Sequence, residues 1–187
     1  MKRPTGACII NDRRYVHCSI VHSDEEILEL VRKSGARVVA IDAPLALPFG
    51  RHCLGEHCRG RQHFRTCDLA LGRMGIRGFP ITIGPMRMLT RRGIRVRRKM
   101  ESRRLRVIET YPGASQDILG IGRKQDGLEL LQNSLKELGC RGEIMRRNLT
   151  GDELDAVSCA LVAKDYSRGR YLAVGNPFEI MMILPSK

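Results

Sequence analysis

Two short apolar runs, each followed by a carboxylate and a proline, constrain the fold of this chain most strongly. Residues 37–44 read Arg-Val-Val-Ala-Ile-Asp-Ala-Pro, and residues 105–112 read Leu-Arg-Val-Ile-Glu-Thr-Tyr-Pro. Continuous apolar runs are typical of strands covered on both faces, as in parallel sheets flanked by helices. Because proline cannot continue a central strand, the chain must leave the sheet just after Asp42 and Glu109. The sequence therefore predicts an α/β fold.

The segments around these two strands fit the same fold class. Residues 5–11 and 14–21 have the pattern of two strands joined by a turn, and Ser23 with Glu26 forms a capping box before a helix that ends at Gly35. We expect the remaining elements to be helices at 67–74, 85–103 and 128–138, a final helix opened by Thr150 and Glu153, and a late strand at 180–184. One domain with a mixed sheet accounts for all 187 residues.

A third acid lies inside the final helix. The helix dipole favours acids in the first turn, which explains Asp152 and Glu153. Asp155 lies beyond that turn, so the dipole explains it less well. Carboxylates are rarely buried unless they are paired or bind a metal. Acids at the carboxyl ends of two strands, with another on a covering helix, would form an oxygen-ligand site for a divalent cation. We expect Asp42, Glu109 and Asp155 to be catalytic metal ligands, with Asp152 and Glu153 in reserve. The alternative is that each acid only accepts hydrogen bonds from a turn or a helix terminus.

The charge of the chain indicates a polyanionic partner. Lysines and arginines number 33 against 20 aspartates and glutamates, which gives a net charge of +13. Ten cations fall within residues 87–106, where Glu101 is the only acid, so pairs within the helix cannot neutralise them. We expect this run to bind nucleic acid, either DNA or RNA, through Arg91, Arg92, Arg95 and Arg98. The alternative is a solvated helix face.

The cysteines and the apolar segments indicate the compartment. Seven cysteines occur without a secretory signal, and no apolar run is long enough to span a membrane. We therefore expect a reduced cytoplasmic protein that contacts no membrane.

A loop at about 47–67 is rich in cysteine and histidine. Cys53, Cys58 and Cys67, with His57, are candidate ligands for a structural zinc ion. Their spacing is not that of a zinc ribbon, which favours the alternative of reduced loop cysteines that bind no metal.

The motifs, in their order along the chain, resemble domain-of-unknown-function family 429. They are Ile41-Asp42-Ala43-Pro44-Leu45, Arg65-Thr66-Cys67-Asp68, Gly75-Ile76-Arg77, Leu89-Thr90-Arg91-Arg92-Gly93, Val107-Ile108-Glu109-Thr110-Tyr111-Pro112-Gly113-Ala114 and Asp152-Glu153-Leu154-Asp155-Ala156. Members of this family are regarded as predicted nucleases with an RNase H-like fold. The resemblance covers Lys2 to about Asn176, and it adds Arg65 and Asp68 as functional candidates without an assigned role.

The resemblance implies a sheet of order 3-2-1-4-5 and a metal-dependent nuclease. Asp42 would end strand 4, Glu109 would end strand 5, and Asp155 would be the helix acid. Two Mg²⁺ or Mn²⁺ ions would act on the phosphodiester bond, one activating water and the other stabilising the leaving oxygen. Two other functions remain open: nucleic-acid binding without catalysis, and a zinc-stabilised interaction module.

The start of the chain departs from the family pattern. Family members begin with a strand that ends in aspartate, whereas this sequence opens at Met1-Lys2-Arg3-Pro4-Thr5-Gly6, where strand 2 should begin. We therefore expect the central strand and one ligand to be missing from this form, a loss that could leave it inactive as an enzyme. We also expect upstream codons to encode an apolar–Gly–apolar–Asp strand. The alternative is a strand supplied by a partner chain, which would make a homodimer.

Overall fold

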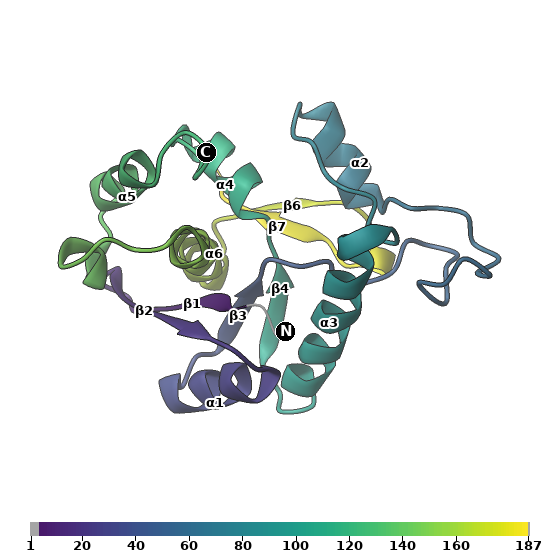
Figure 1. The fold of residues 1–187 in the computed structure, drawn as a ribbon, viewed down its shortest axis with the longest axis horizontal. Helices are drawn as coiled ribbons and strands as arrows, with labels where there is room; N and C mark the ends of the chain where they lie inside the picture. Colours follow the sequence, from purple (N-terminus) through teal and green to yellow (C-terminus); the bar gives the residue numbers. More distant parts are fainter. Residues whose placement is uncertain (1–3, 187) are drawn as a thin grey trace.

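The computed structural model describes residues 4–186, which form two sheets with helix α6 packed across both (Figure 1). The first sheet has the order β1-β2-β5, with β1 at Thr5–Ile10, β2 at Tyr15–Val21 and β5 at Arg141–Gly142. The second has the order β3-β4-β7-β6, with β3 at Val38–Ile41, β4 at Arg106–Glu109, β7 at Met182–Leu184 and β6 at Leu172–Val174. Strands β3, β4 and β7 are parallel, and β6 runs antiparallel to β7.

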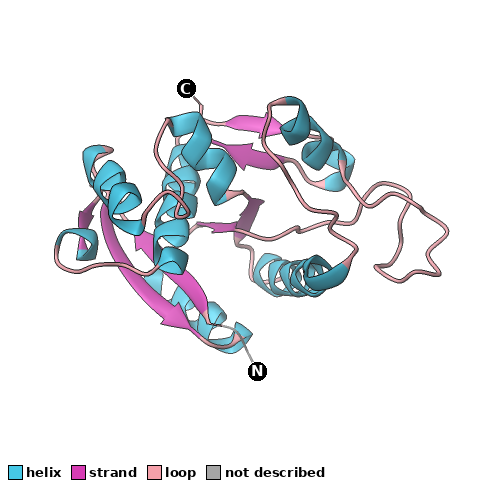
Figure 2. Cartoon of the chain, turned by 45° about the horizontal axis from the view of Figure 1, so that its top comes forward, coloured by secondary structure: helices cyan, strands magenta, loops and turns pink. Residues whose placement is uncertain are grey.

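The helices flank these sheets (Figure 2). They are α1 (Asp24–Ser34), α2 (Thr66–Arg73), α3 (Gly84–Glu101), α4 (Pro112–Leu119), α5 (Leu128–Glu137) and α6 (Gly151–Ser167), with 3-10 turns η1 (Glu143–Met145) and η2 (Pro177–Glu179). None of the described helices is both long and apolar enough to cross a membrane. The mixed α/β class predicted from the sequence is confirmed.

The helix starts and ends follow the signals in the sequence. The Ser23 side chain accepts a hydrogen bond from the Glu26 amide, and Gly35 ends α1 in the left-handed conformation at φ 64°. Both halves of the Thr150–Glu153 capping box are formed at α6. The sequence analysis missed the short strands β5 and β6 and helix α4. We interpreted Pro112 of α4 only as the end of a strand. Proline is also tolerated in the first turn of a helix, because a backbone N–H there has no partner within the helix.

The single sheet expected from the family resemblance is divided in two. Among the described residues, β1 pairs only with β2, and β3 pairs only with β4. All residues of β1 and β3 are only half-buried. Helix α6 packs against both strands and thereby closes the space between the two sheets, which we call the seam.

The register of β3 with β4 decides which way the two strand-end acids point. Ile41 pairs with Glu109, so these two side chains share one face of the sheet. Asp42 follows Ile41 and is directed to the opposite face, because side chains alternate along a strand. Helices α1 and α3 cover the face of Ile41, and α6 covers the other face, which carries Ala40. The two acids therefore lie on different sides of the sheet.

Helix α3 approaches the chain closely just after β3, and a glycine permits it. A Cβ atom at Gly93 would lie 2.7 Å from the carbonyl oxygen of Pro44 and 3.0 Å from the Cβ atom of Ala43. We expect Gly93→Ala to lower the free energy of unfolding by about 1–3 kcal/mol, because backbone atoms would have to shift. Gly72 of α2 is the matched control, since nothing lies within 4 Å of a Cβ atom there. Gly72→Ala should raise that free energy by about 0.5–1 kcal/mol, as in other helices. Urea denaturation compares the two, and equal effects would contradict the close approach.

Candidate functional site: an acidic hollow and a thiol group

Arg65 joins two buried carboxylates beneath the loop that follows β3. It is 1% exposed and immediately precedes α2. Its guanidinium donates to both oxygens of Glu109 at 2.5 Å, and to Asp68 from Nη2 at 2.8 Å and from Nε at 3.1 Å. The amide of Leu45 also donates to Oε2 of Glu109 at 2.8 Å. Each oxygen of Glu109 is therefore engaged by a fixed donor.

This network gives three predicted site residues a structural role. The sequence predicts Glu109 as a metal ligand, whereas the structure makes it the counter-ion of Arg65. Burial raises the pKa of the Glu109 carboxyl, and Arg65 and the Leu45 amide act against that shift. Burial disfavours the charged form of Arg65, but Glu109 and Asp68 outweigh it and raise the pKa of the guanidinium. Arg65 and Asp68 thus fasten the start of α2 to β4.

A second group of acids lies on the α6 side of β3. Asp155 accepts hydrogen bonds from Nζ of Lys124 at 2.6 Å and from Nε2 of Gln116 at 3.2 Å. The same Nζ atom is 3.8 Å from Oδ1 of Asp152. The charges of Asp155, Lys124, Glu109 and Asp152 all act on the pKa of Asp42. Asp152 and Asp155 thus lie beside one ammonium group, and Asp42 lies within reach of its charge.

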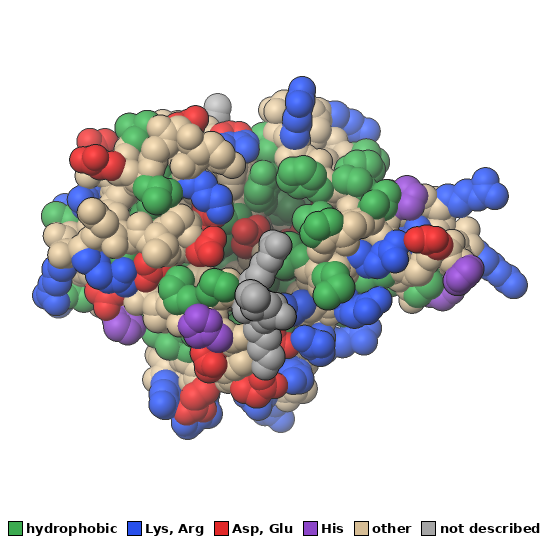
Figure 3. Space-filling view, viewed as in Figure 1, with side chains coloured by type: hydrophobic (Ala, Val, Ile, Leu, Met, Phe, Trp, Pro, Cys, Tyr) green, Lys and Arg blue, Asp and Glu red, His purple; other side chains and the backbone are tan. Residues whose placement is uncertain are grey.

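Asp42 combines an exposed side chain with a shifted pKa. Burial and then the charge of Asp155 raise the pKa of Asp42 to about 7, although Lys124 lowers it. Figure 3 shows acidic side chains inside a hollow near the middle of the molecule.

We call Asp42, Asp152 and Asp155 the acidic hollow; among the described residues, the side chains that lie close enough together to hold a metal ion are those of His52, Cys53 and Cys58, not these three acids. Asp42, Asp152 and Asp155 offer carboxylate oxygens, the ligands that Mg²⁺ and Mn²⁺ prefer. Glu109 is excluded from this set while Arg65 holds both of its oxygens. Glu153 is excluded too, because it is 2% exposed, closes the capping box and accepts a hydrogen bond from Arg147 at 2.6 Å.

The four arginines predicted to bind nucleic acid form two pairs with different roles. Arg92 and Arg95 both bind Asp24 of α1, from Nε at 2.7 Å and Nη2 at 2.6 Å respectively, and so fasten α1 to α3. Arg91 and Arg98 are exposed and form no ion pair with any described residue. Of these four arginines, Arg91 and Arg98 are therefore the two whose side chains are free to bind a polyanion.

A groove of about 820 Å³ runs between α3 and the loop that follows β3. We call it the basic groove, and its cationic residues are Arg91, Arg95, Arg97, Arg98 and Lys99. Its opposite wall contains Leu45, Leu47, residues 53–55 and the side chain of Phe178, which is 85% exposed. Cations beside an exposed aromatic ring suit the backbone and bases of a nucleic acid.

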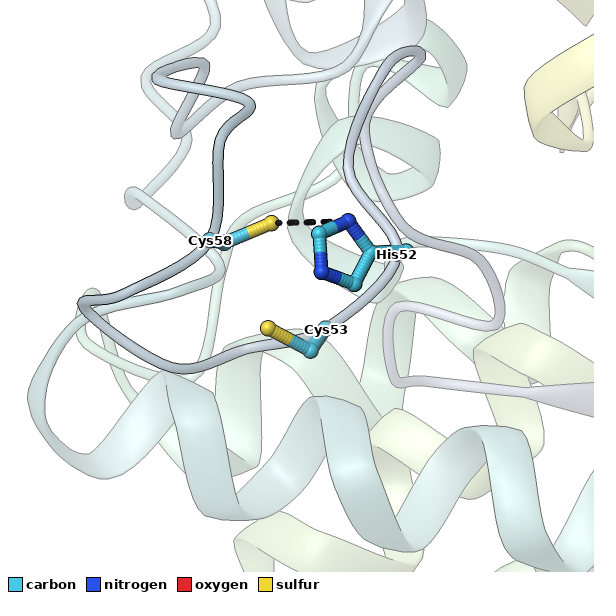
Figure 4. Close-up of side chains that lie close together, drawn as sticks. All are labelled: His52, Cys53 and Cys58. Atoms are coloured by element: carbon cyan, nitrogen blue, oxygen red, sulfur yellow. Dashed lines mark hydrogen bonds between the residues drawn. The ribbon is translucent and has the colours of Figure 1, made fainter.

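His52, Cys53 and Cys58 come together in the same loop (Figure 4). Their ligand atoms all lie within 4.8 Å of one another. Of the four residues predicted as zinc ligands, this group contains Cys53 and Cys58; it also contains His52, and it does not contain His57 or Cys67. Cys67 is instead buried in an apolar cluster with residues of β6 and β7.

The surroundings of Cys58 favour the thiolate form of its side chain. Burial raises the pKa of this thiol, but hydrogen bonds from the backbone of Cys53, His52 and Gly60 outweigh it, and the pKa falls to about 6. The thiolate is the form of cysteine that binds metals. All seven cysteines of the chain are free.

Sequence reasoning overlooked three residues that complete these sites. Lys124 and Gln116 reach Asp155 from the α4–α5 region, and only the tertiary fold brings them to α6. Glu179 is 3% exposed and accepts hydrogen bonds from the amides of Phe49 at 2.6 Å and Thr66 at 2.7 Å. It fastens two distant points of the loop between β3 and α2. No local pattern in the sequence marks these roles.

Comparisons with known proteins place the chain in a family. No curated protein matches it, and no solved structure matches it. A family model described as protein of unknown function, DUF429, matches residues 1–179, which is nearly the whole chain. The resemblance inferred from the motifs is confirmed, and this chain belongs to the DUF429 family.

Proposed function

We propose that this protein hydrolyses phosphodiester bonds of nucleic acid at a divalent metal ion held by Asp42 and Asp155. The observation that carries the proposal is the pair of acids on α6, Asp152 and Asp155, beside the ammonium group of Lys124, whose charge also acts on Asp42 at the end of β3. An ammonium group next to acids is a common substitute for a cation in such a site. The net charge of +13 favours a polyanionic substrate.

The arrangement of strands supports an RNase H-like version of this site. β1 and β3 are edge strands of their two sheets, and helix α6 packs against both. A further strand in the seam would produce the order 3-2-1-4-5 that the family resemblance implies. An acid at the end of such a strand would lie beside Asp42 and add a ligand.

The residues of this chain would divide the work between binding the ion and holding the substrate. Asp42 and Asp155 would hold Mg²⁺ or Mn²⁺, with Asp152 as the nearest further ligand. When bound, the ion supplies an activated water and stabilises the leaving oxygen. Lys124 would release Asp155 and remain close enough to neutralise a phosphate oxygen. Arg91 and Arg98 would hold the nucleic-acid backbone.

Asp155→Asn tests the proposal. We expect Mn²⁺-dependent cleavage of labelled DNA, RNA and hybrid duplexes to fall by more than about 100-fold, because an amide oxygen binds the ion far more weakly than a carboxylate. Asp165→Asn is the matched control on the same helix, since Asp165 only pairs with Arg170 at 2.8 Å. Gel electrophoresis of the products measures both variants. Equal cleavage by the two variants, or cleavage without metal, would refute the site.

The basic groove favours a second candidate function, which is nucleic-acid binding without catalysis. Arg91 and Arg98 would serve binding alone in that case. The same labelled substrates separate the two functions, because a purely binding protein would shift them in a native gel and leave them intact with Mn²⁺.

A further inference from the structure

We propose that His52, Cys53 and Cys58 bind one Zn²⁺ ion, and that this ion orders the loop wall of the basic groove. The side chains lie on the loop between β3 and α2, which contains no helix or strand. The site is chemically separate from the acidic hollow, because thiolate and imidazole ligands select zinc whereas carboxylates select Mg²⁺ or Mn²⁺.

The distances suit a tetrahedral ion. Nδ1 of His52 lies 3.6 Å from Sγ of Cys58. A Zn–S bond of about 2.3 Å and a Zn–N bond of about 2.0 Å at a tetrahedral angle place these two atoms about 3.5 Å apart. The other ligand atoms lie within 4.8 Å, so small side-chain rotations complete the arrangement. Three protein ligands leave one position for water.

The loop is already folded around these ligands. The guanidinium of Arg51 donates to the carbonyl groups of Cys53, Gly55, Gly60 and Gln62. The loop also crosses itself closely, since a Cβ atom at Gly60 would lie 2.5 Å from the carbonyl oxygen of Gly50. The backbone therefore holds Cys53 and Cys58 on facing sides of a closed turn.

The same turn forms part of the basic groove. Cys53, Leu54 and Gly55 line that groove opposite Arg91 and Arg98. Leu54 is 8% exposed and is one of the few apolar side chains that the turn buries. A metal bond to Cys53 would hold this wall in place where little apolar burial can do so. Any effect of zinc on nucleic-acid binding rests on the proposed function, but the metal site itself does not.

Cobalt spectroscopy tests the ligand set. Co²⁺ added to the reduced, metal-free protein should bind at one equivalent and give the thiolate charge-transfer and tetrahedral d–d bands. We expect Cys53→Ser to abolish these bands and Cys8→Ser, on β1, to leave them unchanged. His52→Ala should weaken cobalt binding by about 10-fold or more, whereas His57→Ala should not. Both histidines are exposed, so neither change threatens the fold.

The outcomes that overturn the proposal are distinct. Tetrahedral bands that survive Cys53→Ser, or that disappear in His57→Ala, would place the metal elsewhere. Weak octahedral bands alone would mean binding by oxygen ligands. Limited trypsin digestion tests the ordering of the loop, because Zn²⁺ should slow cleavage after Arg59 and Arg61. Unchanged trypsin cleavage would refute the ordering role. Loss of nuclease activity in Asp155→Asn would concern the proposed function alone and not the zinc site.

Discussion

Replacing Arg65 by methionine should lower the free energy of unfolding by about 3–5 kcal/mol, the usual cost of removing one partner from a buried ion pair. The change would strand Glu109, which is 1% exposed, and Asp68, which is 8% exposed, without a counter-ion. Four hydrogen bonds from the guanidinium would be lost at once. Lysine should not restore them, because a single ammonium group cannot reach both carboxylates in the forked geometry of arginine. Urea denaturation at neutral pH measures the effect.

Arg92→Met is the matched control for this experiment. Arg92 binds Asp24 in a similar geometry, but its side chain is 31% exposed, so its loss should cost only about 0–1 kcal/mol. Combining Arg65→Met with Glu109→Gln should recover part of the stability, because one stranded charge is then removed. If Arg65→Met costs no more than Arg92→Met, Glu109 is not held as described and is available to a metal.

The affinity for Mn²⁺ should fall about tenfold for each pH unit below 7, because a proton and the metal compete for the same carboxylate. Burial and the charge of Asp155 raise the pKa of Asp42 to about 7, so half of the molecules still carry this proton near neutral pH. Asp42→Asn should abolish this dependence on pH and weaken Mn²⁺ binding throughout. Isothermal titration calorimetry from pH 5.5 to 8 measures both effects. A pH dependence that survives in Asp42→Asn would assign the proton to another group.

The same pKa fixes the sign of a stability effect. Because the pKa of Asp42 is raised in the folded state, the folded protein retains a proton that the unfolded chain has released. Its contribution to stability is therefore present at low pH and disappears as the pH rises through about 7. Asp42→Asn should consequently stabilise the protein more at pH 8 than at pH 4.5.

The local signals in the sequence predict the helices better than the site. Ser23 and Gly35 bound α1 as expected, and Thr150 opens α6, because capping depends only on neighbouring residues. The two buried strands also lie where their apolar runs predict them. The sequence predicts that Asp42 and Asp155 lie near each other because ligand sites form at the carboxyl ends of strands, and the charge of Asp155 does act on the pKa of Asp42.

The role of Glu109 could not be predicted in the same way. A shift of one residue in the pairing of β3 with β4 would turn Glu109 to the side of Asp42, and the sequence does not specify that register. Arg65 lies 44 positions away from Glu109. The pairing of Arg65 with Glu109 depends on the path of the loop after β3, which the sequence does not reveal. The pairing of Lys124 with Asp155 likewise depends on the tertiary fold.

The seam has a consequence for the behaviour of the protein in concentrated solution. Each of β1 and β3 exposes one row of backbone N–H and C=O groups that no described strand completes. An open strand edge is a template for any extended peptide, whether native or foreign. Helix α6 packs against both of these strands (Figure 1). Storage conditions that loosen α6 would therefore promote intermolecular β-association before the rest of the molecule unfolds.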